Sequence, residues 1–301
     1  MELSSLPLAG IALAVASALA LSIGNLLQAR GVRVMESRAA AGQSGSKVGH
    51  LLRNRVWLAG AVLLGVSIVL QMGSLAFAPL IVVQPIGVSA LVFTVLLTAI
   101  VLKRAPSAQV VRAIVVCVVG VAAFVTVAAL VSTQTSITDG QLLAVLIVLV
   151  AVLLGTAILL VAGRRRKTPP VLWVLLGGVY SAFVATLGKT VILRVQTLLA
   201  SGHFVWDAAD LLTLFCLIGI GVAGGLSIYF VQRAHAGNRP DVVVAGLTVV
   251  DPTVAVVLGI TILGEAAGAP LWAFFAFVAA GAVAVGGVFA LSHAETIKTA
   301  N

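Results

Sequence analysis

The chain has 301 residues, of which 61% are hydrophobic and only 9% are charged. Soluble domains average about 25% charged residues, so this composition excludes a water-soluble fold for a chain of this length. The formal net charge is +9, but the basic residues stand in short clusters between apolar runs and are not interleaved with aromatic residues. We therefore predict a multi-pass protein of the cell membrane that contacts the lipid bilayer and binds no nucleic acid.

Nine apolar runs are each long enough to cross a bilayer as a helix, which takes about 20 residues. The runs cover residues 6–29, 56–77, 80–102, 110–131, 141–162, 171–195, 209–232, 242–263 and 271–292. The first run is predicted to be a retained span and not a signal peptide, because its positive charges follow the apolar stretch. Residues 31–55 are predicted to be a loop or an extension of the first helix. The predicted fold class is an all-α integral membrane protein with about nine transmembrane helices.

Basic residues gather on one side of the predicted spans. They follow the first, third, fifth and seventh spans, as Arg30, Arg33, Arg38, Lys47, Arg53 and Arg55, then Lys103 and Arg104, then Arg164 to Lys167, then Arg233 and Arg239. The alternate loops hold Arg194 against Asp139, Asp207, Asp210 and Glu265. Because cytoplasmic loops carry an excess of Lys and Arg, we predict that the N-terminus lies outside and the C-terminus in the cytoplasm.

Two segments share a Gln-x7-Pro frame 161 residues apart, from Gln71 to Pro79 and from Gln232 to Pro240. At the same offset, Lys103-Arg104 closes the third span and Gly264-Glu265 closes the eighth. We predict an inverted repeat of five plus four helices, with a first repeat at 1–162, a basic cytoplasmic linker at 163–170 and a second repeat at 171–301. Inverted repeats are typical of secondary transporters, whose substrate site lies near the bilayer midplane between the halves.

Two spans carry a proline that breaks the helical hydrogen-bond pattern. Gln84-Pro85 stands near the start of the third span, and Asp251-Pro252 stands about ten residues into the eighth, which then ends at Leu263-Gly264-Glu265. These motifs resemble the drug/metabolite transporter (EamA-like) superfamily and are most similar to its NIPA-like magnesium transporter branch. The resemblance covers spans one to four and six to nine, and it implies a transporter fold. It departs at Arg104, where relatives often carry an acidic residue.

The candidate substrate or coupling residues are the polar groups inside the spans. An intramembrane ionisable residue is a functional candidate whose partner must be named, so we pair Asp251 with Lys189. The other candidates are Gln84, Asn25, Gln28, Tyr180 and Gln71, with Pro85 and Pro252 as helix breaks. Structural alternatives stay open: Lys189 could reach the outer interface, Asp251 could cap an opened helix, and the amides and Tyr180 could join helices by hydrogen bonds.

Several other motifs do not indicate chemistry. Gly219-x-Gly221-x-x-Gly224 matches a dinucleotide-binding string, but it lies inside an apolar span and not at a strand-to-helix turn. Cys117 and Cys216 also lie inside spans and are interpreted as small buried hydrophobic residues. The four histidines, His50, His203, His235 and His293, show no metal-ligand spacing. We predict no enzyme activity, no cofactor and no resident metal.

The predicted function is secondary transport of a small organic solute or metabolite by alternating access. Three alternatives stay open: a divalent-cation (Mg²⁺) transporter of the NIPA-like kind, a flippase for an anionic lipid-linked substrate, and a non-transporting membrane subunit of an envelope complex. A Mg²⁺ path requires oxygen ligands and net negative charge. The predicted pairing of Asp251 with Lys189 would neutralise that charge and so disfavours this alternative. A second copy of the chain or an envelope partner is also left open.

Overall fold

The computed structural model describes residues 7–40, 54–103, 105–133, 137–163, 169–201, 208–238 and 240–300. Within these ranges nine helices are long and apolar enough to span a membrane. They are α1 (Leu8–Ala40), α3 (Arg55–Phe77), α4 (Leu80–Leu102), α5 (Ala108–Val131), α6 (Asp139–Gly163), α7 (Pro170–Ser201), α8 (Ala208–Gly237), α9 (Pro240–Thr261) and α10 (Leu271–Ala300). The predicted all-α fold and its nine spans are confirmed, and the first span continues as helix to Ala40.

The helix ends follow local chemistry. Asn54 caps α3, since its side-chain oxygen accepts hydrogen bonds from the backbone N–H groups of Val56 and Trp57 at 3.0 and 3.3 Å. Ser107 caps α5 in the same way through Val110. Lys103 ends α4 in the left-handed conformation, with a φ of 50°. These caps satisfy backbone groups that a helix terminus leaves without partners.

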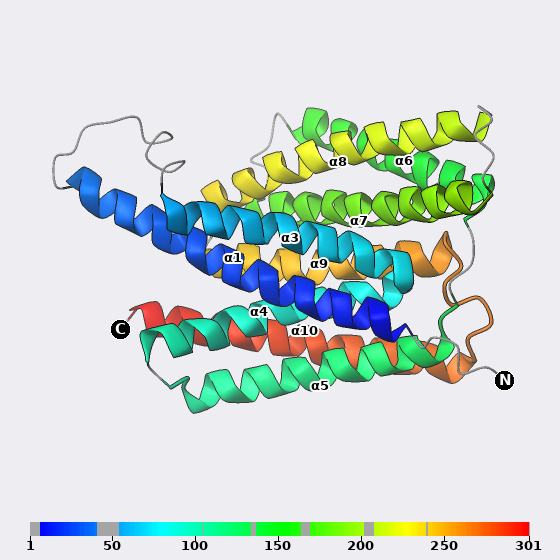
Figure 1. Ribbon diagram of the computed structural model, residues 1–301. Coiled ribbons are helices and arrows are strands. Elements are labelled where there is room, and N and C mark those ends of the chain that lie inside the picture. Colours follow the sequence, from blue (N-terminus) through cyan, green and yellow to red (C-terminus); the bar gives the residue numbers. More distant parts are fainter. Residues whose placement is uncertain are drawn as a thin grey trace.

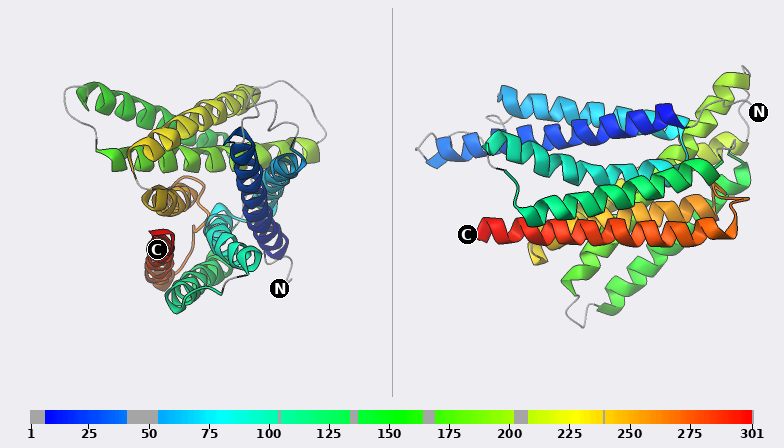
Figure 2. Two further views of the ribbon diagram at one scale, coloured as in Figure 1. Left: turned by 90° about the vertical axis from the view of Figure 1, so that its left-hand side faces the viewer. Right: turned by 90° about the horizontal axis from the view of Figure 1, so that it is seen from below.

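The helices form one bundle in which most axes run nearly parallel (Figure 1). The main packing pairs are α1 with α3, α7 with α8, and α5 with α10, while α4 and α9 lie in the interior between them (Figure 2). Helix α1 begins at one end of the bundle and α10 finishes at the opposite end (Figure 1). An odd number of crossings requires that arrangement.

Glycines bring the α5–α10 pair into close contact. A Cβ placed on Gly120 would lie 2.7 Å from the Cα of Ala284, and one on Gly287 would lie 2.5 Å from the Cα of Cys117. Small residues at such contacts are typical of membrane helices, because lipid supplies no hydrophobic drive and close backbone packing has to hold the helices together.

Three pairs of helix starts come close to the 161-residue offset seen in the sequence, whereas the starts of α3 and α8, at Arg55 and Ala208, do not. Helices α1, α4 and α5 begin at Leu8, Leu80 and Ala108, and α7, α9 and α10 begin at Pro170, Pro240 and Leu271. Helix α6 stands between these two sets. The inverted relation of the halves and the division of the chain at 162 and 171 stay predictions.

Candidate functional site

A buried ion pair lies at the end of the bundle where α4 begins, and hydrogen bonds connect it to the α3–α4 turn. The Nζ of Lys189, on α7, lies 2.7 Å from the Oε1 of Glu265, in the loop between α9 and α10, and the two side chains are 1% and 4% exposed. The same Nζ donates a hydrogen bond to the backbone carbonyl of Ala78 at 2.9 Å. The Glu265 carboxylate accepts hydrogen bonds from the backbone N–H groups of Leu80 at 2.7 Å and Ile81 at 2.9 Å.

We refer to these five residues, Lys189, Glu265, Ala78, Leu80 and Ile81, as the ion-pair cluster. Its carboxylate sits on the first turn of α4, where the N–H groups have no partner within the helix and the helix dipole favours negative charge. Its ammonium is shared between a carboxylate and a carbonyl. Burying two charges costs several kcal/mol each, and only this degree of compensation makes such a pair tolerable away from water.

Local sequence holds Glu265 in position. Gly264 has a φ of +68°, a left-handed conformation that lets the chain turn sharply after α9. Gly259 leaves room for the carboxylate, since a Cβ there would lie 2.9 Å from the Glu265 Oε2. The loop is also fixed to the α5–α6 region, because Thr133 N–H donates to the Glu265 carbonyl at 2.9 Å and the side chain of Gln141 donates to the Leu263 carbonyl at 2.9 Å.

The predicted pairing of Lys189 with Asp251 is wrong. Asp251 meets α7 at Ser181, eight residues before Lys189, which corresponds to about 12 Å along the helix. The alternative in which Lys189 reaches the outer interface is also wrong, because the residue is 1% exposed. From the sequence, Glu265 was expected at the end of the eighth span and in the loop that follows it, and not among the site residues. The available signal was its 161-residue offset from Arg104, which marked the position but not its partner; Arg104 itself lies outside the described residues.

Asp251 forms a second polar site, in the middle of α9. Its Oδ2 accepts a hydrogen bond of 2.6 Å from the hydroxyl of Ser181, while its Oδ1 is buried and has no hydrogen-bond partner. Gly178 allows the close approach of α7 and α9, since a Cβ there would lie 2.7 Å from the Cβ of Val250. Pro252 lacks an N–H, which leaves the carbonyl of Thr248 without its helical donor.

The remaining sequence candidates are not brought together. Tyr180 is fully buried and donates a hydrogen bond to Thr156 at 2.9 Å, so it joins α7 to α6. Gln84 is buried on α4. Asn25 is exposed on α1, and Gln28 and Gln71 are half-buried on α1 and α3. A role for any of these residues in transport stays a prediction.

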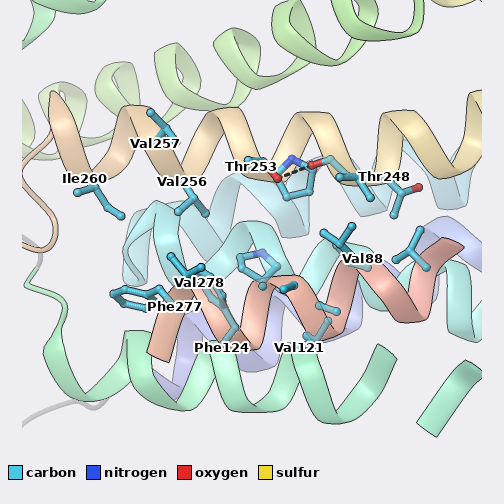
Figure 3. Close-up of a pocket in the computed structure, with 18 of the residues that line it drawn as sticks. Val88, Val121, Phe124, Thr248, Thr253, Val256, Val257, Ile260, Phe277 and Val278 are labelled. Atoms are coloured by element: carbon cyan, nitrogen blue, oxygen red, sulfur yellow. Dashed lines mark hydrogen bonds between the residues drawn. The ribbon is translucent and has the colours of Figure 1, made fainter. Parts of the chain in front are cut away.

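The two helix-breaking prolines line an apolar cavity between α4, α5, α9 and α10, with a volume of about 330 Å³ (Figure 3). Pro85 and Pro252 belong to this lining, whereas Asp251 and Lys189 do not. The ionisable groups and the cavity are therefore separate features, because Asp251 contacts α7 whereas the cavity lies between α4, α5, α9 and α10.

Neither polar site is a ready-made metal cage. Among the described residues, no group of three or more His, Cys, Asp or Glu side chains is placed to hold a metal ion. Of the four histidines, His50 and His203 lie outside the described residues. Any cation at Asp251 would be held by one carboxylate together with neutral oxygens and water.

Comparisons with known proteins agree with the fold. The model of the family described as "Magnesium transporter NIPA" matches residues 6–297. A probable magnesium transporter of Candida albicans is 28% identical over 95 residues, which are 32% of this chain and 26% of that protein. The chain thus matches about a quarter of the length of this curated relative. No solved structure matches the chain significantly.

Proposed function

Since the chain belongs to the NIPA magnesium transporter family, we propose that it carries Mg²⁺ across the cell membrane by alternating access, with Asp251 as the cation contact within the membrane. The alternative named in the sequence analysis is thus better supported than transport of a small organic solute. The chain is a multi-pass membrane protein; the outside position of its N-terminus is part of the proposal.

The charge state of α9 carries this proposal. Lys189 was expected to neutralise Asp251, which disfavoured Mg²⁺, but the ammonium of Lys189 pairs with Glu265. Within the described residues Asp251 has no salt bridge and retains a buried Oδ1 without a partner. A carboxylate without a partner inside the membrane costs free energy unless a positive charge binds it. This cost supports a transported cation as the partner of Asp251.

The surroundings of Asp251 suit Mg²⁺ in particular. This ion takes oxygen ligands, gives up its water slowly, and commonly binds through one or two carboxylates while it keeps several waters. Asp251 supplies the carboxylate, and Ser181 supplies a hydroxyl oxygen at hydrogen-bond distance from it. This neutral and acidic oxygen set contains no nitrogen or sulfur ligand that would favour Zn²⁺ or Cu²⁺.

The ion-pair cluster supports the second half of the proposal. It ties the α3–α4 turn to α7 and to the α9–α10 loop at one end of the bundle. In an alternating-access cycle one end must be closed while the other is open, and a buried, fully compensated cluster is a suitable closure. We assign the closed end of this conformation to the ion-pair cluster.

The test is Mg²⁺ flux into proteoliposomes that contain a Mg²⁺-sensitive dye. We expect flux by the wild type and a loss of at least about tenfold in Asp251→Asn, which removes the charge but keeps an acceptor for Ser181. Asp139→Asn is the matched control: its carboxylate is 57% exposed and pairs with Arg194 at the surface, so its loss should leave flux near wild type. Pro252→Ala should reduce flux less than Asp251→Asn, because it keeps the carboxylate.

Two results would contradict the proposal. Absence of Mg²⁺ flux by correctly folded wild-type protein would reject the substrate. Wild-type flux per folded molecule in Asp251→Asn, together with a lowered unfolding temperature, would show that the carboxylate only fastens α9 to α7.

A further inference from the structure

The apolar cavity lies within the membrane-spanning part of the bundle and is not used by the proposed ion path. Its inner wall consists of buried residues of α4, α5 and α10, namely Val88, Val121, Phe124 and Val288. Its rim includes Val257 on α9 and Phe274 and Val278 on α10, which are 51%, 62% and 58% exposed. These exposed side chains are all apolar and belong to membrane-spanning helices, so we take the cavity to open toward the hydrocarbon of the bilayer.

The lining of the cavity holds few polar groups. Its polar side chains are Thr248 and Thr253. The Thr253 hydroxyl donates a hydrogen bond of 2.7 Å to the Val249 carbonyl (Figure 3), and the Thr248 hydroxyl donates one of 2.7 Å to the Val244 carbonyl, both within α9. The Thr248 carbonyl, which Pro252 leaves without its helical donor, is a single further acceptor. A water molecule needs two to four polar partners to remain in a cavity. The occupant must therefore be apolar.

The shape of the cavity narrows the choice further. Its lining runs along α9 from Thr248 to Ile260, about 18 Å at the helical rise, and along α10 from Phe274 to Val288, about 21 Å. A transmembrane helix is about 10 Å across and too wide for a volume of 330 Å³. An engineered apolar cavity of about 150 Å³ already takes up benzene, so a crevice of this size and length fits an unbranched chain.

We propose that this cavity is a binding site for one acyl chain of a membrane phospholipid. An empty crevice would leave its lining without dispersion contacts on one side, and the neighbouring hydrocarbon restores them. The chain enters between α9 and α10 and lies along Pro85 and Pro252, at the interface of the first-half helices α4 and α5 with the second-half helices α9 and α10. The bound acyl chain packs between these four helices, keeps them at their present spacing and stabilises this conformation.

The experiment compares two glycine substitutions on α10. A Cβ on Gly281 lies 3.8 Å from the ring of Phe124, an ordinary contact, so Gly281→Leu places its side chain in the cavity. Gly286 is exposed and a Cβ there meets nothing within 4 Å, so Gly286→Leu makes the same change on the lipid face. Both proteins are purified in mild detergent, titrated with dioleoyl phosphatidylcholine or dioleoyl phosphatidylglycerol, and weighed by native mass spectrometry.

We expect the wild type and Gly286→Leu to retain one phospholipid per chain, and Gly281→Leu to retain it at least tenfold more weakly. The two headgroups should behave alike. Equal retention by all three proteins overturns the proposal, and retention of only the anionic lipid assigns the binding to a headgroup site elsewhere.

A second arm needs no substitution and so does not depend on the folding of a variant. Wild-type protein in nanodiscs of phosphatidylcholine with brominated acyl chains should show bromine density between α9 and α10 in the cavity. A cavity without bromine density, or one filled by detergent while lipid is present, overturns the proposal. Neither arm depends on whether the protein transports Mg²⁺.

Discussion

Glu265 and Lys189 differ in the hydrogen-bond partners that remain to each of them when the other side chain is removed. Glu265 without Lys189 keeps two backbone N–H donors and the positive end of the α4 dipole. Lys189 without the carboxylate charge keeps only the carbonyl of Ala78 and any neutral oxygen that replaces the acid. The two residues form one pair, but the loss of each partner has a different cost.

This asymmetry gives a prediction about stability. Glu265→Gln should lower the free energy of unfolding by about 3–5 kcal/mol, because it leaves a buried ammonium without a counter-charge. Lys189→Met should lower it by less, because the remaining carboxylate is still held by backbone donors. Denaturant titration of the purified protein in detergent measures both, and a larger effect of Lys189→Met would contradict our account of the α4 terminus.

The double substitution supplies the control for this comparison. If the two side chains stabilise each other, Lys189→Met combined with Glu265→Gln should be less destabilised than the sum of the single variants. Strict additivity would mean that the 2.7 Å contact contributes nothing as a pair.

At the scale of the helices, α5 and α10 are in close backbone contact at Gly120 and Gly287. Gly287 packs against Cys117 with no space for a Cβ, whereas Gly286, the preceding residue, faces open space. A substitution at the first position must push the helices apart, and one at the second need not.

We therefore predict that Gly287→Ala lowers the free energy of unfolding by about 1–3 kcal/mol, the usual cost of overpacking a close contact. Gly286→Ala, the adjacent control, should be neutral or slightly stabilising, since alanine favours a helix more than glycine does. The apparent melting temperature in detergent measures both. Equal behaviour of the two variants would show that α5 and α10 are not held by this contact.

At the scale of the whole molecule, the end that carries the ion-pair cluster is the end where α1 begins (Figure 1). The charge distribution along the sequence predicts that this end faces outward, because the basic clusters follow the spans that end on the opposite side. On that orientation, the closure that we propose for the ion-pair cluster faces the outside.

Cysteine labelling of intact cells tests the orientation. A membrane-impermeant reagent should reach a cysteine placed at Ser136 and miss one at Ser44, two positions outside the described residues. The natural Cys117 and Cys216 are both 0% exposed, so they should contribute little background. The reverse labelling pattern would place the N-terminus in the cytoplasm and the ion-pair cluster at the inner end.

Hydropathy by itself determined the fold class and the number of spans. A helix that crosses lipid needs about 20 apolar residues in succession, so each span is written locally in the chain. The predicted start of the third span at residue 80 and its end at 102 match α4. The other spans differ mainly where a helix continues beyond the apolar run, as α1 does to Ala40. The motifs around Asp251-Pro252 and Leu263-Gly264-Glu265 also indicated the family.

Only the tertiary structure decided which charges meet. The hydrogen bond from Leu80 N–H to the Glu265 carboxylate joins residues 185 positions apart, and no periodicity records such a distance. Two carboxylates, those of Asp251 and Glu265, lie on elements next to the helix that carries Lys189. Close packing at Gly178 sets the level at which α7 crosses α9. At this level Asp251 accepts a hydrogen bond from Ser181, and Lys189 forms its ion pair with Glu265. The cavity is likewise a property of four helices at once, because it is the space that their side chains fail to fill.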